Sequence, residues 1–427
     1  MAKKKQIELT IEEKLQNALV PKEEQPYKIP SNWCWIRLLE SFVNKTDSKK
    51  KIKQKDYLEE GNYPIVDQGR DLIGGYTNDD KLIIYIKKPI IVFGDHTRCI
   101  KYINFDFVQG ADGTKILEPK KIFLEKYFYY AFKNINIPSL GYRRHYPMFN
   151  KLKIQIAPIN EQQRIVNRIE SLFTKLDRAK ELIENTLAQF EQNKMAILHK
   201  AFTGELTAKW RKENNIDLSS WKKCELKEVF KVVKDKYNPQ TENQIVNYIG
   251  LENIETSKGI ISKNNSSEVK SIKTKFKKDD VLYGKLRPYL NKHDVVNFDG
   301  ICSTDILVFR FNDINTAKYI NYYFNLPMFI QYAVENSSGI NLPRVSEKTI
   351  SKYKISLPTI EEQQEIVNIL DNLLAKYNKI KNLEQQLEKI ELLKKAILAK
   401  AFRGELGTNN PDEESAENLL KEILAEK

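Results

Sequence analysis

The sequence predicts an α+β protein with two globular mixed α/β domains, separated by two long helices that pair as an antiparallel coiled coil. Two pairs of matching segments predict this internal pseudo-two-fold repeat. EQQRIVN at residues 161–167 recurs as EQQEIVN at 362–368, and AFTGEL at 201–206 recurs as AFRGEL at 401–406. The third observation is a helical period of apolar residues between the matching segments of each copy.

The repeat divides the 427 residues into six parts. At about 150 residues per domain, this length predicts two or three domains. Amphipathic patterns at 10–19 and 415–425 predict short terminal helices, which we expect to lie near each other or on a neighbouring subunit. In chain order we expect an N-terminal helical segment at 1–21, a globular domain at 22–156, a first long helix at 157–206, a second globular domain at 207–356, a second long helix at 357–406 and a tail helix at 407–427.

The long helices are predicted from apolar residues spaced three and four apart, which is typical of a coiled-coil seam. Each is expected to begin after a proline, Pro158 or Pro358, and to end before a glycine, Gly204 or Gly404. An antiparallel pair with a globular domain at each end is the simplest arrangement, because a whole domain joins the helices. The alternative, in which each helix packs on its own domain, stays open. In the first copy the seam contains Ile165, Ile169, Leu172, Leu176, Ala179, Ile183, Leu187, Phe190 and Ile197.

Within the globular domains, runs of β-branched and aromatic residues predict strands. Short helices are expected at 126–133 and 318–325. The strand-like runs lie at residues 82–86, 89–93, 245–249, 281–283 and 306–311.

The positive charge lies in the two globular domains. Residues 22–155 contain 24 Lys+Arg and 16 Asp+Glu, and residues 207–356 contain 25 and 17, so each has a net charge of +8. The first long helix, at 157–206, is balanced at 7 against 7. Two equally basic domains separated by a rigid spacer predict a polyanionic partner contacted at two places, such as double-stranded DNA.

Motifs of enzymes and metal sites are missing from the sequence. The four cysteines are isolated and the four histidines have no metal-ligand spacing. No phosphate-binding loop or dinucleotide fingerprint occurs. We therefore expect a non-catalytic chain that holds no cofactor or metal.

Hydropathy and the N-terminus predict the location of the chain. No segment approaches the roughly 18 apolar residues of a membrane helix, and the N-terminus lacks the apolar run of a signal peptide. We expect a cytoplasmic protein with no membrane partner.

Candidate DNA-contacting residues come mainly from the scarce arginines, because a guanidinium can hold a guanine edge or a phosphate with two hydrogen bonds. Most of these arginines follow a turn signal, and neighbouring polar residues complete the set. In the first domain the candidates are Gln68, Arg70, His96, Arg98, Arg143, Arg144 and His145. In the second domain they are Lys285, Arg287, Tyr289, Ser303, Thr304, Asn341 and Arg344. For each one, a surface or structural salt-bridge role is the alternative.

The paired helix openings, the Ala-Phe-x-Gly-Glu-Leu endings and the tryptophans that lead each domain, Trp33 and Trp221, resemble the specificity subunit HsdS of type I restriction-modification enzymes. The segment GDHTR at 94–98 is also similar to a recurring segment of the target-recognition domains of that family. The match extends over nearly the whole chain. In the second opening, Pro358 lies one residue further from the Glu-Gln pair than Pro158 does in the first, so the two helix starts are not expected to be equivalent.

The resemblance implies that each globular domain recognises one half of a bipartite, asymmetric DNA site. It implies that the helices set the spacing and bind two modification subunits, which carry S-adenosylmethionine and methylate adenine. Two restriction subunits would supply ATP-driven translocation and cleavage, with Mg²⁺ also bound by partner subunits. This chain would contain no catalytic residues.

Other functions also stay open. The chain could serve a modification-only or type II-like bipartite methyltransferase or nuclease. It could also be a coiled-coil scaffold without sequence-specific DNA binding, or a lone methyltransferase or nuclease.

Overall fold

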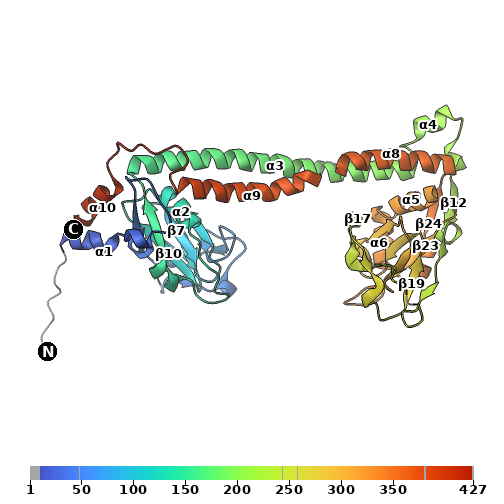
Figure 1. The fold of residues 1–427 in the computed structure, drawn as a ribbon, viewed down its shortest axis with the longest axis horizontal. Coiled ribbons are helices and arrows are strands. Elements are labelled where there is room, and N and C mark those ends of the chain that lie inside the picture. Colours follow the sequence, from blue (N-terminus) through green and yellow to red (C-terminus); the bar gives the residue numbers. More distant parts are fainter. Residues whose placement is uncertain (1–9, 48, 243, 257, 379–380, 426–427) are drawn as a thin grey trace. The chain divides into compact units, whose positions relative to one another are not determined.

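The computed structural model describes residues 10–425 except 48, 243, 257 and 379–380. The chain divides into two compact units. Unit 1 consists of Met1–Leu182 and Gln385–Lys427, and unit 2 consists of Ile183–Glu384. Each unit has a sheet-rich globular part and segments of long helix (Figure 1).

Unit 1 contains two sheets and a separate strand pair. The first sheet is antiparallel with the order β2-β10-β7-β8, and the second has the order β3-β9-β4-β5, with β6 also paired to β9. The strands are β1 (Cys34–Arg37), β2 (Phe42–Asn44), β3 (Lys51–Ile52), β4 (Tyr63–Val66), β5 (Gly75–Thr77), β6 (Ile83–Ile84), β7 (Ile90–Gly94), β8 (Ile100–Ile103), β9 (Phe107–Gly110), β10 (Thr114–Pro119) and β11 (Lys153–Ile156). The β1–β11 pair joins the two ends of the globular part.

Unit 2 has a four-stranded antiparallel sheet with the order β13-β23-β20-β21 and a five-stranded sheet with the order β14-β19-β22-β15-β18. The strands are β12 (Lys222–Glu225), β13 (Lys231–Val232), β14 (Lys236–Tyr237), β15 (Asn247–Ile249), β16 (Ile254–Glu255), β17 (Gly259–Ile260), β18 (Asn264–Asn265), β19 (Lys273–Phe276), β20 (Val281–Gly284), β21 (His293–Val295), β22 (Gly300–Cys302), β23 (Ile306–Arg310) and β24 (Lys354–Leu357). Strands β12 and β24 pair as β1 and β11 do in unit 1.

The two four-stranded sheets place corresponding strands in corresponding positions. Strand β7 of unit 1 and β20 of unit 2 are the third strands, and every residue of both is buried because the sequences IIVFG and VLYG are almost wholly apolar. Each strand ends at a glycine, Gly94 or Gly284, and each is followed by a turn into the next strand of the sheet.

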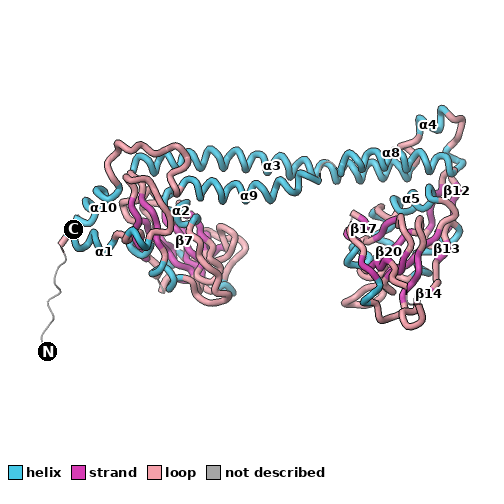
Figure 2. The backbone as a smooth tube through the Cα atoms, viewed as in Figure 1, coloured by secondary structure: helices cyan, strands magenta, loops and turns pink. Residues whose placement is uncertain are grey.

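The helices follow the predicted pattern, with one difference (Figure 2). The first long helix extends over most of 157–206, and both short helices expected in the globular domains are present as α2 and α5. The second long helix is described as two segments, α8 and α9, and residues 379–380 between them lie outside the described residues. The helices are α1 (Ile11–Ala18), α2 (Glu125–Asn134), α3 (Ile159–Thr203), α4 (Ala208–Glu213), α5 (Ile314–Tyr323), α6 (Pro327–Glu335), α7 (Glu347–Ser351), α8 (Ile360–Asn378), α9 (Lys381–Ala401) and α10 (Ala416–Ala425). The expected strand at 82–86 is limited to β6, because residue 82 ends a short 3₁₀ helix.

The long helices contribute apolar side chains to the core of each unit. In unit 1, Ile165 and Ile169 of α3 and Leu398 of α9 share one cluster with Phe128 and Phe132 of α2. In unit 2, Leu198 of α3 and Ile366 and Leu370 of α8 share a cluster with Tyr319 and Phe324. Part of the predicted helix seam therefore packs against the globular part of its own unit.

A tryptophan and a buried glutamate connect each globular part to a helix start. Trp33 Nε1 donates a hydrogen bond to Glu161 Oε2 at 2.8 Å in unit 1, and Trp221 Nε1 donates to Glu362 Oε2 at 2.9 Å in unit 2. Both carboxylates are fully buried. Burial raises the pKa of Glu161, although the Trp33 hydrogen bond opposes this. The glutamines that follow, Gln162 and Gln363, are buried as well, so a buried polar junction explains the repeated Glu-Gln pair.

The two terminal helices lie together in unit 1, which confirms that prediction. Lys421 of α10 forms an ion pair with Glu12 of α1 at 2.8 Å. The N–H of Ala416 donates to the carbonyl of Asn32 at 2.9 Å, which ties the start of α10 to the globular part. Within the described part of the chain, no helix combines the length and hydrophobicity needed to cross a membrane.

Candidate nucleic-acid interface

The turn after β7 brings together four segments of unit 1. The main-chain N–H of Asp95 donates to Gly113 O at 2.6 Å, and Asp95 O accepts from the N–H of His145 at 2.9 Å. Gln68 Oε1 accepts from the N–H of His96 at 3.2 Å, and Gln68 O accepts from Thr97 Oγ1 at 2.5 Å. Residues far apart in sequence therefore meet at the end of one buried strand.

The turn after β20 is held in the same way in unit 2. The N–H of Lys285 donates to Asp305 O at 2.9 Å, and Lys285 O accepts from the N–H of Val345 at 3.0 Å. The next strand starts after a hydrogen bond from the N–H of Gly284 to Lys292 O, as it does after the bond from Gly94 to Cys99 O in unit 1. We use the name turn clamp for the two hydrogen bonds made by the main-chain N–H and carbonyl of Asp95 in unit 1, and for the two made by those of Lys285 in unit 2.

Most predicted residues of unit 1 lie on the four segments that meet at the turn clamp. Arg70, Arg98, Arg143 and Arg144 are exposed, and Gln68 and His96 are half-buried. The Arg98 backbone is left-handed, with φ of 62°, and its Nη1 donates to Ile137 O at 2.9 Å, so one edge of this guanidinium is already used.

The surface near this turn also contains an acid held by cations. Lys51 donates to Asp112 Oδ1 at 2.9 Å. This hydrogen bond, with a smaller contribution from Arg144, lowers the pKa of Asp112 below its usual value. The loops around the turn are therefore a cationic environment.

The position of His145 corrects the prediction that it contacts DNA. Its side chain is fully buried. Nδ1 lies 2.8 Å from Asp95 O and donates to it, while Nε2 accepts from the N–H of Leu140 at 3.0 Å. Both ring nitrogens are thus engaged inside unit 1, and we assign His145 to the support of the 139–146 loop.

The predicted residues of unit 2 also lie on segments that meet at the turn clamp. Arg287, Tyr289, Thr304 and Asn341 are exposed, and Lys285, Ser303 and Arg344 are half-buried. The N–H of Arg287 donates to Pro343 O at 2.7 Å, which joins the turn to the 338–345 loop. Arg344 is partly committed within the protein, because its Nε donates to Asp305 Oδ1 at 3.0 Å.

The sequence of this chain matches one known protein family over most of its length. A family model described as the type I restriction modification DNA specificity domain matches residues 30–189 and 219–392, which together make up most of the chain. The chain belongs to this family of specificity subunits. Such subunits are the DNA-recognition components of type I restriction-modification systems, and the resemblance stated from the sequence is confirmed.

Individual relatives of this specificity subunit match along nearly the whole chain. The EcoDI specificity subunit of Escherichia coli is 28% identical, over 94% of this chain and 96% of its own length. A solved structure of a type I restriction-modification system, studied for complex assembly and conformational transition, has a TM-score of 0.63 at 18% identity and covers 89% of this chain and 100% of its own. The HsdS subunit of Thermoanaerobacter tengcongensis has a TM-score of 0.50 at 18% identity, covering 90% of this chain and 100% of its own. The two structures support the mixed α/β fold.

Sequence reasoning missed three residues of this specificity subunit that border the turn clamps. Asp305 supplies the carbonyl of the second clamp and pairs with Arg344. Tyr142 and Ile340 are the tips of the 139–146 and 338–345 loops, and both side chains are fully exposed. A glycine directly before each tip, Gly141 or Gly339, was the available sequence signal, and both glycines have a positive φ.

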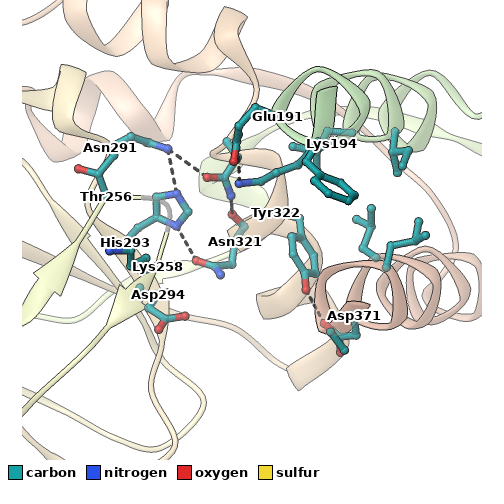
Figure 3. Close-up of a pocket in the computed structure, with 18 of the residues that line it drawn as sticks. Glu191, Lys194, Thr256, Lys258, Asn291, His293, Asp294, Asn321, Tyr322 and Asp371 are labelled. Carbon is teal, nitrogen blue, oxygen red and sulfur yellow. Dashed lines mark hydrogen bonds and ion pairs between the residues drawn. The ribbon is translucent and has the colours of Figure 1, made fainter. Parts of the chain in front are cut away.

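Unit 2 also contains a pocket of about 720 Å³ between its globular part and helices α3 and α8 (Figure 3). Its wall includes His293, whose Nδ1 donates to Asn321 Oδ1 at 2.7 Å and whose Nε2 accepts from Asn291 Nδ2 at 3.1 Å. Burial lowers the pKa of His293 to about 4, so the ring is neutral at pH 7. Both ring nitrogens have partners within the protein, and the histidine is part of the packing of unit 2.

Proposed function

We propose that this specificity subunit reads one half of a bipartite, asymmetric DNA site with each globular domain, at residues 22–156 and 207–356. The observation that carries the proposal is the turn clamp, which occurs in both units and brings exposed or half-buried arginines to the end of a buried strand. Arginines on a fixed main chain suit base edges and phosphates, because little backbone freedom is lost on binding. The equal charge of +8 on each domain supports two equivalent DNA contacts.

The residues proposed to contact DNA are the predicted ones without His145. They are Gln68, Arg70, His96, Arg98, Arg143 and Arg144 for one half-site, and Lys285, Arg287, Tyr289, Ser303, Thr304, Asn341 and Arg344 for the other. Arg70, Arg143 and Arg287 are the strongest candidates for base edges, since each is exposed and its guanidinium forms no hydrogen bond or ion pair with the residues that the structure describes.

We further propose that the long helices form an antiparallel coiled-coil spacer with internal pseudo-two-fold symmetry. In unit 1, Asp177 of α3 pairs with Lys394 of α9 at 2.5 Å, and Lys180 pairs with Glu391 at 3.9 Å. The order along α9 is opposite to that along α3, which supports an antiparallel pair. The length of this spacer would set the gap between the half-sites.

Catalysis belongs to partner subunits in this proposal, and the chain itself is not an enzyme. Two modification subunits would dock on the helices and bind S-adenosylmethionine, and two restriction subunits would bind ATP and Mg²⁺. The chain would act in the cytoplasm, where the genomic DNA of a prokaryote lies.

Methylome sequencing of a host with and without this gene tests the proposal. We expect one bipartite motif to lose its methylated adenine when the gene is absent. Exchange of residues 22–156 for the matching domain of a relative should change one half of the motif only. Unchanged modification without the gene, or a change in both halves after the exchange, would contradict the proposal.

A single substitution tests the assigned surface. Arg287→Ala should weaken specific DNA binding by about 1–3 kcal/mol, roughly five- to 150-fold, through loss of a two-bond contact. Lys209→Ala on α4 is the control with the same charge change, because Lys209 is exposed and its ion pair with Glu213 is on the surface. Equal losses in the two variants, measured by competition with nonspecific DNA, would remove Arg287 from the recognition surface.

A further inference from the structure

Two side chains of the chain stand out by their exposure. Tyr142 is 100% exposed and Ile340 is 101% exposed, and they are the most exposed large hydrophobic side chains among the described residues. Single exposed apolar residues are common on protein surfaces. These two differ from scattered examples because they occupy the tips of corresponding loops, three and five residues before His145 and Val345 of the turn clamps.

The backbone of each loop is fixed, although the tip side chain is free. In unit 1, Tyr142 O accepts from His96 Nδ1 at 2.9 Å, and buried His145 holds the N–H of Leu140. In unit 2, Ser338 and Arg344 exchange two main-chain hydrogen bonds of 3.0 and 2.8 Å that close the base of the loop. Little backbone entropy would therefore be lost when a partner covers either tip.

The surroundings of the tips indicate a partner whose exterior is anionic and whose interior is apolar. Exposed Arg143 and Arg144 follow Tyr142 directly, and Arg344 and exposed Arg287 lie beside the loop of Ile340. A cationic rim around a single apolar tip suits a duplex, whose phosphates surround stacked bases. Proteins that kink DNA insert apolar side chains between adjacent base pairs in this way, and aromatic rings stack on bases.

We propose that Tyr142 and Ile340 are wedges, one for each half-site, that enter between adjacent base pairs and kink the duplex while the neighbouring arginines hold the backbone. This inference rests on the proposed function. The wedges position the DNA, and their insertion adds a specificity term, because base steps that unstack easily are cheaper to kink. One wedge in each domain gives two separate kinks.

The test uses the full chain with its modification subunits and DNA that contains the motif found by methylome sequencing. The position and size of DNA bends are measured from the mobility of circularly permuted fragments, and unstacking is followed with 2-aminopurine at adenines other than the methylated one. We expect a bend within each half-site and a severalfold rise in fluorescence beside it. Tyr142→Ser should abolish both signals in one half-site only, and Ile340→Ser in the other only.

Controls separate a wedge from a general surface effect. Tyr142→Phe and Ile340→Leu should keep the bends, whereas Tyr85→Ser and Ile245→Ser remove side chains that are 74% and 73% exposed outside these loops and should change neither signal. Bends that persist in both tip variants, or loss of modification subunits from the complex instead of loss of bends, would overturn the proposal. Failure of the unaltered complex to protect any bipartite site would instead count against the proposed function itself.

Discussion

The two units share one aromatic contact where the globular part meets the long helices, and they differ beside it. Tyr127 meets Phe402 in unit 1, and Tyr319 meets Phe202 in unit 2. In unit 1, aromatic rings fill this junction: Tyr130 of α2 meets Phe173 of α3 edge to face at 5.8 Å, and Tyr129 lies 5.7 Å from Tyr102. In unit 2, Asn321 and Tyr322 of α5 border the 720 Å³ pocket with His293 (Figure 3).

An ion pair occurs at the same place in both junctions. Lys126 of α2 pairs with Glu170 at 2.5 Å, and Lys318 of α5 pairs with Asp371 at 3.1 Å. Beside the shared ion pair and the shared Phe–Tyr contact, the connection therefore has further aromatic rings in unit 1 and polar side chains in unit 2. Both units therefore use the same kind of ion pair between the short helix and the long helix, while the side chains around this ion pair differ. Because of this difference, we expect the two units to respond differently to mutation and to pH.

The largest difference is expected at the buried glutamates. Arg211 Nη1 lies 2.5 Å from Glu362 Oε1, and the side chains of both residues are buried. Arg211→Met should lower the free energy of unfolding of unit 2 by about 3–5 kcal/mol, because it leaves a buried charge without its partner. Hydrogen exchange of peptides from 222–232 and 354–370 would detect the loss.

The variant compared in unit 1 is Arg164→Met, although Arg164 forms its ion pair with Glu413 and not with the buried Glu161. Arg164 binds Glu413 with two hydrogen bonds of 2.7 and 2.8 Å, but its side chain is 39% exposed. We expect a loss of only about 1 kcal/mol. Equal destabilisation of the two units would show that the two junctions are energetically alike.

Acid is also expected to lower the stability of unit 2 more than that of unit 1. The pKa of His293 is about 4 in the folded chain, below its ordinary value of 6.5. Unfolding lets the ring take a proton at a pH where the folded form does not, so stability is complete above pH 6.5 and falls as the pH drops toward 4. The loss amounts to about 3 kcal/mol at 1.36 kcal/mol per pKa unit.

Ile100 is the first residue of β8 and takes the position that His293 takes in β21, because Ile100 pairs with Phe93 and His293 pairs with Tyr283. Unit 1 therefore has no titratable side chain at this position. Hydrogen exchange at pH 7 and pH 5 should therefore show faster opening of 281–296 than of 90–103 at low pH. His293→Gln should reduce the difference, and an undiminished difference in that variant would assign the acid sensitivity to other groups.

A smaller effect is expected from the aromatic junction of unit 1. Tyr129→Asn introduces the residue type of Asn321 and removes ring contacts with Tyr102 and Tyr130. Unit 1 should lose about 1–2 kcal/mol, because each ring pair contributes roughly 0.5–1.5 kcal/mol. Tyr129→Phe is the control and should cost little in denaturant unfolding; an equal loss would point to the hydroxyl.

The smallest effect is expected from the shared ion pairs. Lys126→Met and Lys318→Met should each change unfolding by less than about 1 kcal/mol, because these side chains are 47% and 42% exposed. Added salt should reduce the difference from the unaltered protein. A larger, salt-independent loss in either variant would mean that the lysine stem contributes through packing.

Local signals in the sequence predicted the helices well. The period of apolar residues and the glycines at 204 and 404, both with positive φ, placed the long helices to within a few residues. Apolar runs predicted the strands β7, β20 and β23. Counting charged residues by segment located the positive charge in the two globular domains. These features depend on neighbours along the chain, and so they can be recognised without coordinates.

The tertiary structure alone decided which loops meet and which side chains face water. The turn clamps join residues 95, 113 and 145, or 285, 305 and 345, through the strand order of a sheet. His145 and Arg144 are neighbours in sequence, yet one ring is buried and bonded on both sides while the other side chain is exposed. Sequence assigned them the same role because both are cationic residue types after a glycine. Burial is set by contacts with residues fifty positions away, and no local pattern encodes it.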